Sequence, residues 1–97
     1  MPSYIVLMNW TDQGVRSFKE SVDRGAAAEI ALSPAGIRFI DLRWTVGAHD
    51  LIATLEAPDD ETLAAALLTL AAQGNLRTTT LRAFTAEEMR GVIAKAT

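Results

Sequence analysis

The residues best suited to chemistry are His49 and Asp50, which are adjacent in a short polar connection between two apolar runs. His49 is the only histidine. Because an imidazole changes charge near neutral pH, it could serve as a general base, or as a single metal or haem ligand. A metal site needs further ligands at fixed spacing, and no serine or cysteine is placed to complete a nucleophilic arrangement. The pattern therefore favours a solvent-exposed turn histidine, with Asp50 hydrogen-bonded to the turn backbone.

A second, polar and aromatic cluster ends the first apolar run and consists of Asn9, Trp10, Thr11, Asp12 and Gln13. Loops at strand ends often carry binding residues, so this cluster is a candidate ligand site, with Trp10, Asp12 and Gln13 as its first candidates. The alternative is structural: Thr11 or Asp12 caps a helix, and Trp10 closes the edge of the core. Helix starts strongly prefer these residue types, which favours the structural interpretation.

Charged residues on the expected strands form a third group: Asp41, Arg43 and Arg77. If they lie on an uncovered sheet face, they could bind a small anion or a polar ligand. Arginine is also enriched at protein interfaces. We therefore expect this face to be an interface between copies of the chain.

The elements that must position these residues follow from hydrophobic periodicity. Residues 4–10 predict a strand, and residues 15–32 a helix with an interruption near Ser21. Residues 37–46 and 50–57 predict a hairpin, residues 58–73 a helix that ends at Gly74, and residues 75–84 a last strand. Thr85 to Glu88 is a capping box that opens a final helix. Each helix has an apolar stripe that we expect to be buried. In the first helix it is Val22, Ala26 and Ile30; in the second it is Leu63, Ala64, Leu67, Leu68 and Ala71; in the last it is Met89, Val92, Ile93 and Ala96.

The hairpin register is predicted from the sorting of its side chains. Pairing Trp44 with Leu51, Leu42 with Ala53 and Ile40 with Leu55 places six apolar residues on one face. Phe39 then pairs with Glu56 on the opposite face. A fully buried Trp44 would make Trp44→Ala cost ~3–5 kcal/mol.

The order β-α-β-β-α-β-α predicts an α+β fold, a ferredoxin-like βαββαβ sandwich with a four-stranded antiparallel sheet plus a C-terminal helix. We expect residues 1–97 to form one domain. We expect both crossover helices to cover one face of the sheet. The other face would then expose a large apolar patch, which monomers rarely tolerate, so we expect a homo-oligomer, a dimer or higher. We also expect strands one and three to run parallel, which would keep the loop of Trp10 to Gln13 away from His49 and Asp50 unless a partner chain joined them.

Composition narrows the classes of function. The formal net charge of −3 argues against nucleic-acid binding, and no apolar run is long enough for a membrane span. The chain has no cysteine and no secretory leader pattern, so we expect a cytoplasmic protein. Nothing in the pattern calls for a cofactor or a metal.

Four blocks in order resemble the GYD-domain family: YIVLMNWTDQGVR at residues 4–16, WTVGAHD at 44–50, EAPDDE at 56–61 and GNLRTTTLRAFT at 74–85. The family is named for a Gly-Tyr-Asp signature; here His49 stands where the tyrosine would precede Asp50, and Ala48 separates it from Gly47. The resemblance implies a bacterial protein with a ferredoxin-like, dimeric α+β-barrel fold, and implies no particular activity.

Three hypotheses of function follow. The first is a homo-oligomeric module that binds a small molecule in a cavity at the sheet face. The second, by analogy of fold alone, is a small cofactor-independent or haem-type monooxygenase or isomerase. The third is a structural or interaction protein. A catalytic residue would have to come from His49, Asp41, Asp50 or the arginines.

Overall fold

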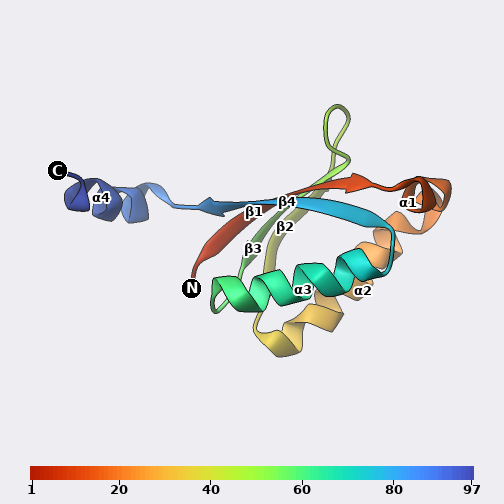
Figure 1. Cartoon of the computed structure of the whole chain (residues 1–97), viewed down its shortest axis with the longest axis horizontal. Coiled ribbons are helices and arrows are strands. Elements are labelled where there is room, and N and C mark those ends of the chain that lie inside the picture. The colour runs from red at the N-terminus through yellow and green to blue at the C-terminus, as the bar shows by residue number, and fades with distance from the viewer.

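The computed structural model describes all 97 residues and has an antiparallel four-stranded sheet with strand order β2-β3-β1-β4 (Figure 1). Its strands are β1 Ser3–Trp10, β2 Arg38–Trp44, β3 Leu51–Glu56 and β4 Leu76–Ala83. Its helices are α1 Asp12–Arg16, α2 Ser21–Leu32, α3 Asp60–Ala72 and α4 Ala86–Lys95, with short 3₁₀ turns at Phe18–Glu20 and Ser33–Ala35. Helices α2 and α3 lie on one sheet face. The predicted ferredoxin-like fold class with a C-terminal helix is confirmed, as is the interruption of the first helical segment before Ser21.

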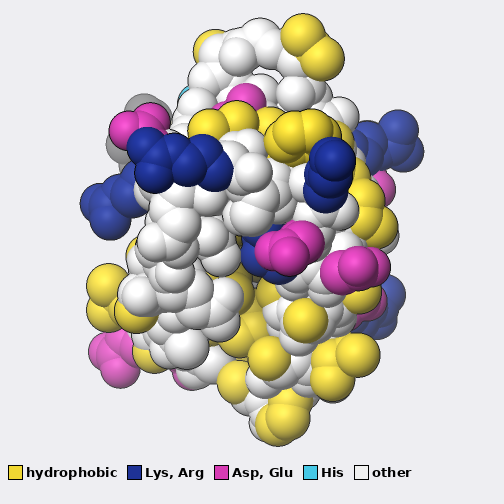
Figure 2. Space-filling view, turned by 90° about the vertical axis from the view of Figure 1, so that its right-hand side faces the viewer, with side chains coloured by type: hydrophobic (Ala, Val, Ile, Leu, Met, Phe, Trp, Pro, Cys, Tyr) yellow, Lys and Arg dark blue, Asp and Glu magenta, His cyan; other side chains and the backbone are white.

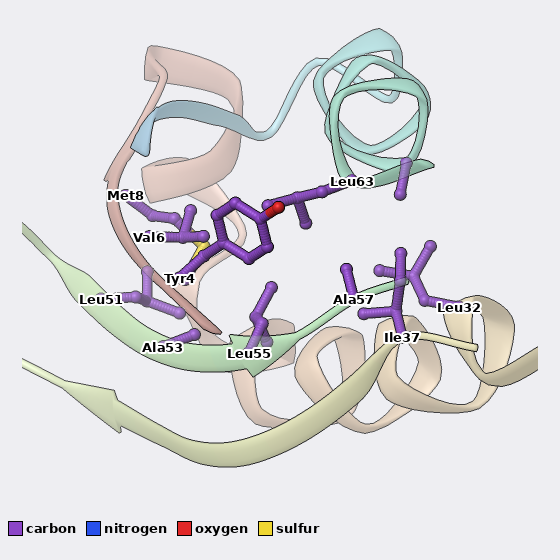
Figure 3. Close-up of a cluster of buried hydrophobic side chains, with 11 residues drawn as sticks. Tyr4, Val6, Met8, Leu32, Ile37, Leu51, Ala53, Leu55, Ala57 and Leu63 are labelled. Atoms are coloured by element: carbon purple, nitrogen blue, oxygen red, sulfur yellow. The ribbon is translucent and has the colours of Figure 1, made fainter. Parts of the chain in front are cut away.

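The core lies between the sheet and helices α2 and α3 (Figure 3). Alternate residues of β1 and β3 point into it because side chains alternate between the two faces of a strand. Leu63 of α3 and Leu32 of α2 close it from the helix side. The buried apolar set is Tyr4, Val6, Met8, Leu32, Ile37, Leu51, Ala53, Leu55, Ala57, Leu63 and Ala66. None of the helices combines the length and the apolar character that crossing a bilayer requires.

The predicted hairpin register is correct near the connection and wrong at its far end. Trp44 pairs with Leu51 and Leu42 with Ala53, as expected. A β-bulge then shifts the register, so that Phe39 rather than Ile40 pairs with Leu55. The extra residue reverses which side chains face the core. Phe39 consequently packs against the core, and Ile40 is exposed.

Trp44 is the last residue of β2, and its side chain is 38% exposed. Its indole Nε1–H donates to Ser21 Oγ at 2.8 Å. Because the ring keeps part of its surface in solvent, the cost of Trp44→Ala falls below the range for a fully buried tryptophan.

Helix α2 is turned differently from the prediction. Val22, Ala26 and Ile30 are exposed. Gly25 faces the sheet, where an added Cβ would lie 3.0 Å from Leu42 Cδ2. The lack of a side chain at Gly25 therefore lets α2 approach the sheet closely, and this contact decides which face of the helix is buried.

The other two helices depart from their predicted stripes as well. In α3, Leu63 is buried and Leu67 is half-buried, whereas Ala64 and Leu68 are exposed. In α4 the predicted stripe of Met89, Val92, Ile93 and Ala96 is exposed throughout, because the helix projects beyond the end of the sheet (Figure 1). The capping box that opens α4 is confirmed: Thr85 N–H donates to Glu88 at 2.8 Å, and Glu88 N–H donates to Thr85 Oγ1 at 3.1 Å.

Tyr4 links β1 to the first turn of α3 through a hydrogen bond from its hydroxyl to Asp60 Oδ1. Burial raises the pKa of Tyr4 above its ordinary value of 10.0, and the Asp60 carboxylate raises it further. Since the folded-state pKa is the higher one, the stability linked to Tyr4 is fully present below pH 10 and is lost as pH rises through the folded-state pKa.

Because Tyr4 is the only tyrosine, an ultraviolet absorbance titration reads it alone. We expect a phenolate midpoint above 10.0 in the folded protein and a lower midpoint in Asp60→Asn. The unfolded chain in urea, as control, is expected to titrate at the ordinary value. A folded-state midpoint at or below that of the unfolded chain would contradict the buried position of the ring.

Candidate functional site

The end of β1 and the start of β3 meet at a hydrogen-bonded cluster. Asp50 N–H donates to Met8 O at 2.9 Å, and Asp50 Oδ2 accepts from Trp10 N–H at 2.9 Å. The expectation that strands one and three run parallel is wrong, because β1 and β3 are antiparallel. The two polar clusters that the sequence seemed to separate are therefore joined within one chain.

His49 is held at this cluster by Asn9. Asn9 Nδ2 donates to Ala48 O at 2.9 Å, which leaves Asn9 Oδ1 as the partner of His49 Nδ1, also at 2.9 Å. His49 Nδ1 is thus the donor, and Nε2 is the imidazole atom open to another group. Thr45 Oγ1 adds a bond to His49 O at 2.5 Å. The expected exposed turn histidine is instead half-buried and bonded to β1.

Asp50 has a different role from the predicted one. Its carboxylate accepts from the neighbouring strand, through Trp10 N–H, and not from the turn. Only its backbone carbonyl belongs to the hairpin, where it accepts from Thr45 N–H at 2.8 Å. Asp50 therefore holds the β2–β3 connection against β1 through its hydrogen bonds to Trp10 and Met8.

The loop after β1 is also hydrogen-bonded to the connection between α3 and β4. Thr11 Oγ1 accepts from Gly14 N–H at 3.1 Å, which confirms a cap on α1, and donates to Gly74 O at 2.5 Å. Gln13 Nε2 donates to Gln73 O and to Asn75 Oδ1, each at 3.0 Å. These bonds support the structural interpretation of the loop.

The remaining candidates do not converge on a ligand. Asp12 is exposed in the first turn of α1. Asp41 and Arg43 form an exposed ion pair with 2.9 Å between Oδ2 and Nε on the edge strand β2. Arg77 lies on β4 at the opposite edge of the sheet, so β1 and β3 separate it from that pair. The three charges therefore form no shared anion site.

Comparison with known proteins identifies the fold family. Residues 4–93 match the GYD domain. The chain belongs to the GYD-domain family. It is also 33% identical over 84 residues to the "Glutamine synthetase and cystathionine beta-lyase binding protein" of Thermus thermophilus, an alignment that covers 86% of this chain and 88% of that protein.

The GYD domain described here has two hollows near the cluster. One is shallow and lies on the open sheet face, where Leu7, Ile52 and the 45–49 connection surround His49. The other is a mainly apolar cavity of about 60 Å³ on the opposite side, between the sheet and helices α2 and α3. Its lining includes Trp10, whose Nε1–H is buried without a hydrogen-bond acceptor. A cavity of this size can hold a few waters or a small apolar group.

Two residues that organise the cluster were not among the predicted site residues: Thr45 and Asn75. Asn9 belongs to the polar cluster that was predicted at the end of the first strand, and it is the residue that bonds His49. The Thr45 bond is local, to the carbonyl of His49 four residues later, whereas Asn75 gains its role from the pairing of β1 with β4.

Proposed function

We propose that this GYD domain is a protein-interaction module that binds metabolic enzymes, with glutamine synthetase and cystathionine beta-lyase as the first targets to test. The observation that carries the proposal is the outward face of α2, defined by Val22, Ala26 and Ile30. Val22 is 64% exposed and Ile30 is 74% exposed. These residues are spaced four apart, so they form one continuous apolar strip.

Such a strip is unusual on a surface that meets only water. Figure 2 shows hydrophobic side chains gathered over the lower half of the molecule, at the height of α2 and α3. Leu68 on the outer side of α3 belongs to the same layer and is exposed too. The Thermus thermophilus relative is named for binding two enzymes, which supports an interaction role for a chain of the same family and similar length.

The test is direct binding between the purified chain and both enzymes of its own organism. We expect binding by the wild type and at least a ~10-fold weaker affinity for the double variant Val22→Glu, Ile30→Glu, because charges replace apolar contacts. Both positions are exposed, so the variant should keep its fold. The matched control is Val46→Glu, at a fully exposed apolar residue of the hairpin connection. Absence of wild-type binding to either enzyme, or equal binding by the double variant, contradicts the proposal.

A second candidate function is small-molecule binding, and the cavity beside α2 favours it. Its apolar lining and the unpartnered Trp10 Nε1–H suit a small apolar ligand with one hydrogen-bond acceptor. This cavity is on the helix side of the sheet, not on the open face where the sequence suggested one. Native mass spectrometry of the freshly purified protein tests it, since a retained ligand adds mass to the chain. The monooxygenase or isomerase alternative has only the analogy of fold behind it.

A further inference from the structure

The cavity between the sheet and helices α2 and α3 has a lining that is apolar in most places and polar in a few. Its apolar wall includes Val6 of β1 and Ala53 of β3, which are each 1% exposed. The lining side chains that carry a charge or an amide group are Arg24, Gln73 and Asn75. Because such groups fix the orientation of a bound molecule, their positions decide which ligand the cavity suits.

The polar part of the lining lies at one end of the cavity, beside α1. Trp10 pairs with Leu76 at the start of β4, and Asn75 directly precedes Leu76. Arg24 Nη2 donates to Gly14 O at 3.3 Å, and a Cβ at Gly14 would lie 3.1 Å from Asn75 Cα. Trp10, Arg24 and Asn75 are therefore neighbours. The Arg24 side chain is 23% exposed, so this end of the cavity reaches solvent.

This polar end has hydrogen-bond donors that lack acceptors. Trp10 Nε1–H is buried and unpartnered, and an indole nitrogen can only donate. Arg24 donates from Nη1 to Ser17 O and to Ser17 Oγ, each at 2.9 Å, and from Nη2 to Gly14 O. A guanidinium has more N–H donors than these bonds use, so Arg24 can still donate to a ligand.

The charges around the cavity favour an anion. No acidic side chain belongs to its lining. Arg24 has an ion pair with Glu20, at 3.8 Å between Nη1 and Oε2, but the Glu20 side chain is 73% exposed. An ion pair so open to solvent is weak, which leaves Arg24 available to the carboxylate of a ligand.

We propose that this cavity binds a short-chain monocarboxylate. Its aliphatic body lies against Val6 and Ala53, and its carboxylate accepts from Trp10 Nε1–H and from Arg24. A carboxylate has two acceptor oxygens, and its hydrogen bonds are strengthened by its charge. The cavity volume limits the buried body to a few carbon atoms. An inorganic anion would suit the polar end and leave the apolar wall without a partner. The proposal rests on the second candidate function above, small-molecule binding, and gives the ligand a chemical class.

Nuclear magnetic resonance of the ¹⁵N-labelled full chain tests the ligand class, with n-butyrate as the probe. The neutral and cationic matches are n-butanol and n-butylammonium. The chain has two tryptophans, so it has two indole N–H signals, and Trp10→Phe identifies the one that belongs to Trp10. We expect n-butyrate to move the Trp10 indole proton downfield and to bind at least ~10-fold more tightly than n-butanol.

The same titrations separate failure of the ligand class from failure of small-molecule binding. Equal or tighter binding of n-butanol or n-butylammonium overturns the carboxylate proposal and leaves small-molecule binding standing. An unmoved Trp10 indole signal with all three probes overturns both. Shifts confined to exposed residues would indicate adventitious binding at the surface, and they also overturn the proposal.

Two variants locate the bound carboxylate. Arg24→Gln removes the charge and is expected to reduce the preference for n-butyrate over n-butanol to less than ~3-fold. The matched control is Arg16→Gln, at an exposed arginine of α1 outside the lining, which should leave the preference unchanged. Because Arg24 also holds α1 through Ser17, a second variant leaves Arg24 intact: Ala28→Leu fills the cavity from α2 and should abolish binding. An unchanged preference in Arg24→Gln, or wild-type binding by folded Ala28→Leu, overturns the proposal.

Discussion

Gly14→Ala is expected to destabilise the fold by about 3 kcal/mol, the upper part of the range for overpacking a close contact. A Cβ at Gly14 would lie 2.1 Å from Asn75 O, and 3.0 Å from Asn75 C. Both are backbone atoms, so no side chain can rotate away. The same carbonyl oxygen accepts from Thr11 N–H at 3.1 Å, and moving it would break the bond that joins the β1 loop to the start of β4.

The measurement is urea unfolding, with the midpoint and the slope fitted separately. The matched control is Gly91→Ala in α4, where an added Cβ meets nothing within 4 Å. Alanine favours a helix over glycine by ~1 kcal/mol, so the control should raise helix content and should not lower the midpoint. Equal midpoints for Gly14→Ala and the wild type would show that the loop does not approach Asn75 as closely as described.

Leu63→Ala is expected to cost ~2–5 kcal/mol. Leu63 is 2% exposed and is among the largest fully buried side chains in the core. It fills the space between α3 and the central strands, beside Tyr4 (Figure 3). Truncation removes its apolar burial and leaves a cavity that the surrounding sheet can only partly fill.

Leu68→Ala in the same helix is the control, since it has the same change in helix propensity. Leu68 is 72% exposed, so we expect a change within ~0.5 kcal/mol. Unfolding midpoints from circular dichroism compare the two variants. A similar loss for both would mean that α3 is rotated about its axis relative to the structure.

The candidate site could be predicted only in part because it depends on strand direction. Trp10, His49 and Asp50 were identified as polar residues at strand ends, from residue type alone. A crossover helix makes β1 and β2 parallel, and the hairpin then reverses the chain, so β3 must run against β1. This geometry brings Trp10 to Asp50, and it brings the neighbouring Asn9 to Ala48 and His49.

The sequence by itself determined the order and the type of the main elements of this protein, and most of their ends to within a few residues. The apolar run of residues 4–10 and the alternation of residues 50–57 are local properties of strands, and the caps at Thr11, Asp59 and Thr85 act within three residues. Only the tertiary structure decided which face of each helix is buried. Gly25 turns α2 toward Leu42, the bulge before Asp41 exchanges Phe39 with Ile40, and the junction at Phe84 carries α4 away from the sheet. Each of these depends on contacts between segments distant in the chain, and a periodic pattern of apolar residues cannot distinguish a stripe that covers its own core from one that remains exposed to a partner.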